Sequence, residues 1–253
     1  MSPIVRLRYS VAGPARYISH LDRSRAIERA LRRARTPVAY SQGFNPRPKV
    51  SFGPPLPLGV VSRAEYLDLE LTEYSDSVLP TLAGAMPPGL RLLAGGLVRG
   101  KVESLMSFIN AAEYRVVARG PAGMRDRIAE VLENILSEGE IIIRKEAKGK
   151  TKKKDLRPGI YELAFVGWGS RRLFDFTVPE GAEDRYYLFE MTLAVGNKGS
   201  VRPEEVMEAV GRRCPLEVEF PLLHIERIRL FRRTEHSSTD PLDLCDPISS
   251  GVL

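Results

Sequence analysis

The 253 residues are 43% hydrophobic and 28% charged, which is an ordinary globular composition without an apolar run of the length that a membrane helix needs. The net charge of +6 is unevenly spread, since residues 1–50 hold eleven Lys/Arg against two Asp/Glu, a balance of +9. Residues 144–157 hold eight against two, a balance of +6. Such polarised charge favours a polyanionic ligand, most commonly a nucleic acid.

The two cysteines, Cys214 and Cys245, lie far apart in the sequence. This usage is typical of a cytoplasmic protein with reduced thiols. Two cysteines are too few for a four-cysteine iron–sulfur cluster or for the three-cysteine motif of radical enzymes. Three scattered histidines also make a zinc site improbable. We therefore expect a cytoplasmic chain without a cofactor, a metal site or a membrane segment of its own.

The first half predicts the order β-α-β-β-α-β. Residues 4–11 alternate like a strand with one buried face, and a helix begins after the possible cap Ser19 and runs to about Ala34. Short strands flank the loop "GFNPRP", and a further strand, a weaker helix and a last strand follow. The pattern indicates a ferredoxin-like unit over residues 1–98.

The second half repeats this order with an extra strand or two, so we expect a second ferredoxin-like unit over residues 99–233. It carries a basic loop at residues 148–158. Residues 234–253 contain no Lys or Arg and little periodicity, which predicts a disordered tail. The fold class is therefore α+β, with two tandem ferredoxin-like halves and antiparallel sheets.

The basic residues form two clusters that are candidates for phosphate contacts. Arginines on the first helix could form a solvated face, but only Glu28 intervenes among them, and unpaired arginines at this density repel one another. The second cluster lies on the basic loop, where solubility is the plain alternative. The candidates are Arg25, Arg29, Arg32, Arg33, Lys150, Lys152, Lys153, Lys154 and Arg157.

The stretch "YSQGFNPRPKVSF" adds a proline-stiffened loop to the first cluster. Prolines on both sides of Arg47, with Lys49 following, would present cations at low entropic cost. Phe44 at the loop tip is expected to be exposed and could stack on a base, whereas Phe52 fits the core better. Asn45 could read a base edge, although asparagine before proline is also ordinary turn chemistry.

His20, at the start of the first helix, is the one candidate for catalysis. A helix N-terminus disfavours a protonated histidine, which would suit a general base in RNA cleavage. A structural histidine that hydrogen-bonds to a nearby carbonyl is the stronger interpretation from one sequence. We find no phosphate-binding loop, catalytic triad or metal motif in the sequence.

The run from Arg16 to Leu71, "RYISHLDRSRAIERALRRARTPVAYSQGFNPRPKVSFGPPLPLGVVSRAEYLDLEL", resembles the radical SAM-linked protein family. This is a bacterial domain of unknown function, encoded beside or fused to a cobalamin-binding-type radical SAM protein. A weaker similarity continues in "KTKKKDLRPGI" and "SVRPEEV". Arg23 and Arg35 depart from the family pattern, which more often has an apolar residue and a glycine there.

The resemblance implies a radical SAM partner and names no reaction for this chain. Three functions remain open from the sequence. The first is a non-catalytic RNA-binding protein that presents an RNA, such as tRNA or rRNA, to a radical SAM modification enzyme. The second is a metal-independent endoribonuclease that uses His20, and the third is a protein-interaction scaffold whose basic face docks an acidic partner.

Overall fold

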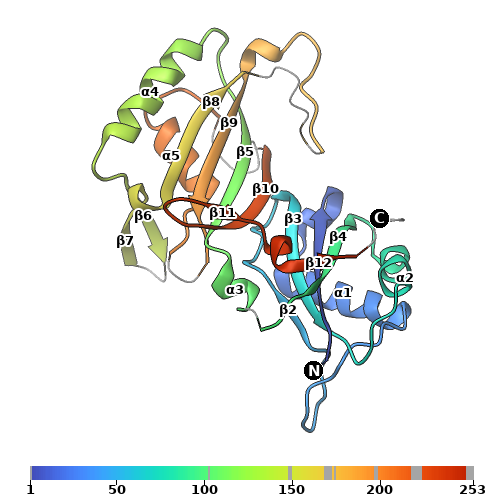
Figure 1. Cartoon of the computed structure of the whole chain (residues 1–253). Coiled ribbons are helices and arrows are strands. Elements are labelled where there is room, and N and C mark those ends of the chain that lie inside the picture. Colours follow the sequence, from blue (N-terminus) through green and yellow to red (C-terminus); the bar gives the residue numbers. More distant parts are fainter. Residues whose placement is uncertain are drawn as a thin grey trace. The chain divides into compact units, whose positions relative to one another are not determined.

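The computed structural model describes residues 2–101, 103–147, 150–167, 173, 175–196, 199–217 and 224–248. The fold is mixed α+β, with mostly antiparallel strands and few helices. The chain forms two compact units (Figure 1): the first comprises Met1–Asn110 with Arg229–Leu253, and the second comprises Ala111–Ile228. The sequence predicts a division after residue 98, whereas the observed first unit extends to Asn110 and includes the C-terminal segment.

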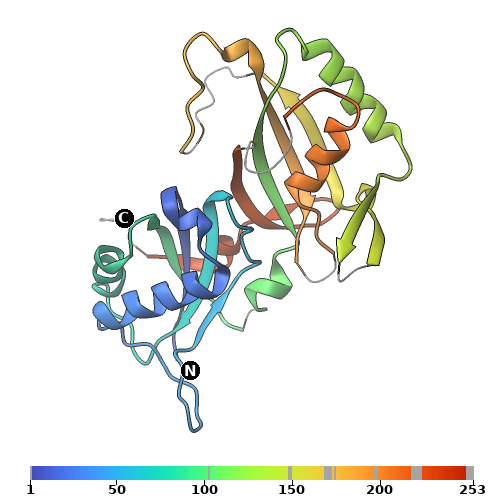
Figure 2. The same ribbon diagram turned by 180° about the vertical axis from the view of Figure 1, so that it is seen from behind.

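The first unit has the order β-α-β-β-α-β, followed by a short helix. Strand β1 lies between β4 and β3, and β2 pairs with the other edge of β3, all antiparallel. Helices α1 and α2 lie on the same face of these strands (Figure 2). The elements are β1 (Ile4–Val11), η1 (Gly13–Tyr17), α1 (His20–Arg33), β2 (Val50–Phe52), β3 (Val61–Glu70), α2 (Val78–Ala85), β4 (Leu90–Val98) and α3 (Leu105–Phe108).

Helix α1 begins as the sequence predicts. The side chain of Ser19 accepts a hydrogen bond from the backbone N–H of Asp22 at 3.1 Å, which satisfies one free donor of the first turn. Ile27, Ala30 and Leu31 of its apolar face are buried. Each large apolar side chain buried in this way contributes about 1.5–3 kcal/mol, so this face fixes which side of α1 remains for the solvent.

The second unit repeats this strand order with an inserted hairpin. Its strands follow the order β10-β5-β9-β8, while β6 and β7 form a separate two-stranded sheet. Lys150–Asp155, expected to be part of a loop, thus forms a strand. The elements are β5 (Ala111–Arg119), α4 (Arg125–Ser137), β6 (Ile142–Ala147), β7 (Lys150–Asp155), η2 (Arg157–Gly159), β8 (Ile160–Val166), η3 (Glu183–Arg185), β9 (Tyr186–Ala194), α5 (Pro203–Gly211) and β10 (His224–Arg233). The division of the chain falls within β10, whose residues from Arg229 on belong to the first unit.

The expectation of a disordered tail over residues 234–253 is wrong for the described part up to residue 248. This segment forms β11 (Ser238–Thr239), η4 (Pro241–Leu244) and β12 (Cys245–Pro247). Strand β11 pairs with β10, and β12 pairs with the free edge of β4. Residues 249–253 lie outside the described residues.

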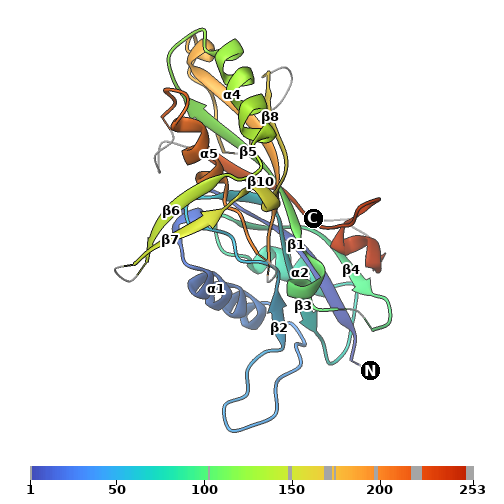
Figure 3. The same cartoon turned by 90° about the vertical axis from the view of Figure 1, so that its left-hand side faces the viewer.

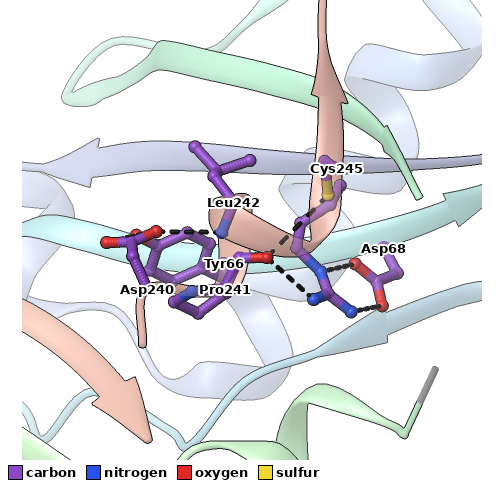
Figure 4. Close-up of polar contacts among 7 residues, drawn as sticks. Tyr66, Asp68, Asp240, Pro241, Leu242 and Cys245 are labelled. Carbon is purple, nitrogen blue, oxygen red and sulfur yellow. Dashed lines mark hydrogen bonds and ion pairs between the residues drawn. The ribbon is translucent and has the colours of Figure 1, made fainter. Parts of the chain in front are cut away.

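Polar contacts hold η4 against β1 and β3 (Figure 4). The guanidinium of Arg6 donates from Nη1 to the carbonyl of Pro241 at 3.1 Å, and Tyr66 Oη donates to the carboxylate of Asp240 at 3.0 Å. Asp240 also accepts from the backbone N–H of Leu242 at 2.9 Å. The segment is ordered because its partners come from β1 and β3, which a local sequence pattern does not reveal.

Candidate nucleic-acid interface

The predicted arginines of α1 lie on its exposed side, opposite the buried Ile27 and Leu31. Arg25 lies 3.6 Å from Asp22, and Arg32 lies 3.8 Å from Glu28. Long, solvent-exposed pairs of this kind contribute about 0–1 kcal/mol, so either arginine can leave its partner for a stronger anion.

The other two arginines of this set differ in how firmly they are held. Arg33 Nη2 donates to the carbonyl of Ala85 at the end of α2, at 2.6 Å. The side chain of Arg29 makes no hydrogen bond or ion pair within the described part of the chain. Helix α1 therefore presents four cations whose charge is only weakly compensated by neighbouring carboxylates.

Helix α1 ends in a Schellman motif that places an arginine where glycine is usual. The N–H of Thr36 bonds to the carbonyl of Leu31 at 3.0 Å, and the N–H of Arg35 bonds to that of Arg32 at 3.1 Å. Arg35 adopts a φ of 51°, in the left-handed region. This conformation is strained for a residue with a Cβ, so the fold keeps an exposed guanidinium here at a conformational cost.

The proline-containing loop after α1 projects beyond the end of β2 (Figure 3). Its base is closed by the bridge between Tyr40 and Pro48 and by two bonds between Ser41 and Arg47, at 2.9 and 3.0 Å. Phe44 at the tip is fully exposed, as predicted, and Asn45 and Arg47 are also exposed. The loop thus presents an aromatic ring, an amide and a cation to the solvent.

Lys49 and Phe52 follow this loop, and both have partners in the first unit. Lys49 Nζ forms an ion pair with Glu70 at 2.8 Å, in which both side chains are partly exposed. Phe52 is half-buried, and its ring meets the His20 ring edge-on at a centroid distance of 5.5 Å. Phe52 is therefore a packing residue at the sheet edge, whereas Lys49 keeps part of its surface accessible.

His20 remains partly exposed at the first turn of α1. Burial lowers the pKa of its imidazole below the usual value of 6.5, and the nearby charge of Arg23 adds to this effect. Arg23 is itself buried, and within the described residues its side chain makes one hydrogen bond, a long one of 3.4 Å to the carbonyl of Ile18. The neutral imidazole is thus favoured, while a role in catalysis stays a prediction.

A groove of about 260 Å³ separates the last turn of α1 from the base of the projecting loop. Arg32, Arg35, Tyr40 and Pro48 line it, together with the buried Leu31 and Val38. The sequence distinguishes Arg35 only as a departure from a family pattern. The signal that could have identified it is a charged residue directly after a helix and before Thr-Pro, where a glycine would end the helix without strain.

The second predicted cluster belongs to the second unit, where its members have different environments. Lys152 and Lys153 are exposed on β7. Lys154 Nζ donates to Glu205 at 2.7 Å and to the carbonyl of Ser200 at 2.6 Å, and Arg157 Nη1 donates to the carbonyl of Ile160 at 3.2 Å. The side chain of Lys150 lies outside the described residues.

Among the described residues, no three His, Cys, Asp or Glu side chains are grouped so as to hold a metal ion. Cys214 and Cys245 are both buried and carry free thiols. No helix in the described ranges is both long and apolar enough to cross a lipid bilayer.

Residues 5–203 match the sequence profile of DUF2344, a family described as an uncharacterized protein conserved in bacteria. The chain therefore belongs to this family. Among curated proteins, none matches the sequence significantly.

Three solved structures resemble the chain, which spans about half the length of the chain matched in each. A Cbf5-Nop10-Gar1 complex matches with 15% identity over 91% of this chain and 48% of the other, at a TM-score of 0.45. An H/ACA RNP bound to a substrate RNA containing 2′-deoxyuridine matches with 16% identity over 90% and 47%, at 0.40. The archaeal box H/ACA sRNP Nop10-Cbf5 complex matches with 16% identity over 91% and 47%, at 0.39. Similarity at this level carries no argument about function.

Proposed function

We propose that this chain is a non-catalytic RNA-binding protein that presents an RNA, such as tRNA or rRNA, to a radical SAM modification enzyme. The observation that carries the RNA-binding part is the surface formed by the exposed face of α1 and the projecting loop. We call it the α1–loop surface and define it by Arg25, Arg29, Arg32, Arg33, Phe44, Asn45, Arg47 and Lys49.

The α1–loop surface combines two kinds of contact that single-stranded and structured RNA require. Weakly paired guanidinium groups bind phosphate through charge-assisted, often bidentate hydrogen bonds. A fully exposed ring such as Phe44 stacks on any base that is not already stacked in a helix.

The strand order of both units supports the interpretation that the chain contains two tandem ferredoxin-like halves. In the first unit the order is β4-β1-β3-β2, and in the second it is β10-β5-β9-β8. If the four strands of each sheet are numbered along the chain, without the inserted hairpin β6–β7, the two units have the same strand order. Lys152 and Lys153, which are exposed on the second unit, would contact phosphates there.

The radical SAM part of the proposal is supported by the resemblance of residues Arg16–Leu71 to the radical SAM-linked family. In that arrangement the partner enzyme supplies the radical chemistry, and this chain supplies the affinity for RNA. A purification from the native host should then yield RNA and a cobalamin-type radical SAM protein with this chain.

RNA binding is tested by titrating a structured RNA at several salt concentrations. Affinity should fall steeply with salt, because each neutralised phosphate releases counterions. Replacing Arg29, Arg32 and Arg33 by alanine should flatten the log–log slope by about 1–3 units. A matched control replaces three exposed arginines of the second unit, Arg119, Arg125 and Arg127, by alanine.

The control removes the same net charge from another place, so it should change the slope far less. Equal losses in both triple variants would show that only the net charge matters and that the α1–loop surface is not the site. A wild-type chain without RNA affinity near physiological salt would contradict the proposal as a whole.

A further inference from the structure

The groove beside α1 has the composition of a site for a flat ring. Its apolar wall consists of the buried Leu31 and Val38 together with Pro48, and Tyr40 stands in it with 47% of its surface exposed. At about 260 Å³ the groove is slightly smaller than the roughly 300–1,000 Å³ of sites for drug-sized ligands. A single nucleobase fits this description, and a base-paired helix does not, because its bases are stacked and paired.

Two cations border the same groove. Arg32 and Arg35 both line it, and Arg32 lies within 3.8 Å of Glu28, which also lines it. The two guanidinium groups belong to the last turn and the C-terminal cap of α1, so helix geometry keeps their backbones in a fixed relation. A base in the groove would thus have its phosphates within reach of cations from one rigid element.

The strain at Arg35 is an independent sign that this groove has a use. A glycine at this position would complete the same Schellman hydrogen bonds. It would avoid the cost of holding a residue that has a side chain in the left-handed region. Strained backbone of this kind persists only where the surrounding structure enforces it, and it clusters at ligand sites. The side chain that the strain retains is the one that borders the groove.

We propose that this groove holds one unstacked base of a single-stranded RNA segment, which stacks on Tyr40 while Arg32 and Arg35 contact the flanking phosphates. This inference rests on the proposed RNA binding and deepens it: the RNA class becomes one with an accessible single-stranded stretch, such as a loop or an end. The protein would then prefer such RNAs over a fully paired duplex of equal length.

The test compares the 253-residue chain with three variants, using a short single-stranded RNA that contains 2-aminopurine and a blunt duplex of equal length. Stacking on Tyr40 should quench 2-aminopurine fluorescence when the single strand binds. Tyr40→Leu should lose this quenching and lower single-strand affinity by about 5- to 150-fold, the effect of losing one base–aromatic stack. Tyr40→Phe keeps the ring and should retain both.

Arg35→Gly separates binding from folding. Because glycine relieves the left-handed strain, this variant should melt at a higher temperature than the wild type, and yet bind the single strand more weakly. Weaker binding by a more stable protein cannot result from unfolding. If Arg35→Gly and Tyr40→Leu both leave the single-strand affinity unchanged, the groove is not a base site.

The duplex distinguishes failure of this inference from failure of the proposed function. If the wild type binds duplex and single strand equally, and Tyr40→Leu alters neither, RNA binding stands and the groove inference is wrong. If the wild type binds neither RNA, the proposed function itself is wrong.

Discussion

Each unit places an arginine of its first strand directly opposite a carboxylate of a neighbouring strand, with opposite results for burial. In the first unit, Arg6 of β1 faces Asp68 of β3, and the side chain of Arg6 is 0% exposed. In the second unit, Arg115 of β5 faces Glu190 of β9, and their side chains are 23% and 31% exposed. Equivalent cross-strand pairs are therefore buried in the core of the first unit and partly exposed at the surface of the second.

The difference arises from what lies over the pair. In the first unit η4 and β12 cover it, and the carbonyl of Pro241 accepts the donor of Arg6 that Asp68 leaves free. In the second unit the pair lines an open groove of about 400 Å³, together with Glu113, Glu162 and Thr192. Solvent thus reaches the second pair and screens its attraction.

The comparison shows what burial demands of an ion pair. Burial by itself disfavours the charge of Arg6, but its hydrogen bonds to Asp68 and the charge of that carboxylate outweigh this, so the pKa of the guanidinium is raised. Nε and Nη2 of Arg6 donate to the two oxygens of Asp68, each at 2.8 Å. Each of the three nitrogens of Arg6 thus has a hydrogen-bond partner, and removing one partner of such a buried pair leaves the other charge uncompensated.

The largest effect is expected from Arg6→Met, which keeps the volume of the side chain and removes its charge. Asp68 would then remain largely buried without its cation, and the free energy of unfolding should fall by about 3–5 kcal/mol. Chemical denaturation followed by circular dichroism measures this loss. A loss below about 1 kcal/mol, as for an exposed pair, would mean that the two pairs are equivalent and the comparison fails.

An intermediate effect is expected from Tyr66→Phe, which removes the hydroxyl that donates to Asp240. A hydrogen bond to a charged group contributes about 1.5–3 kcal/mol, and this one holds only the covering segment. Hydrogen exchange should therefore accelerate at the amides of Leu242 and Arg99, which bond to Asp240 and to the carbonyl of Leu244. Exchange that stays as slow as in the wild type would show that the segment is held by other contacts.

The sequence predicts the parts of this architecture whose causes are local. The cap at Ser19, the apolar face of α1 and the exposure of Phe44 follow from spacing and turn chemistry within a few residues. Leu67 and Leu69, two residues apart on β3, share a face of that strand, and both are buried.

What the sequence could not predict depends on partners that lie far away in the chain. The contact between Arg6 and Pro241 spans 235 residues, so the order of the C-terminal segment is invisible in its own composition. Lys154 lies in a lysine run that looks solvent-exposed, but its partner Glu205 comes from another element, 51 residues away. The groove beside α1 requires the register of Tyr40 with Pro48, which alternation alone does not determine.

The smallest effect is expected from Arg115→Met in the second unit. Because solvent screens the pair with Glu190, the free energy of unfolding should fall by only about 0.2–1 kcal/mol. A double-mutant cycle with Glu190→Gln isolates the pair from the loss of packing, and its coupling energy should shrink further in concentrated salt. The corresponding cycle between Arg6 and Asp68 should be nearly insensitive to salt, since no solvent ions reach a fully covered guanidinium. A coupling at Arg115 as large and as salt-resistant as that at Arg6 would show that the open groove is closed in solution, and that something covers the second pair as η4 covers the first.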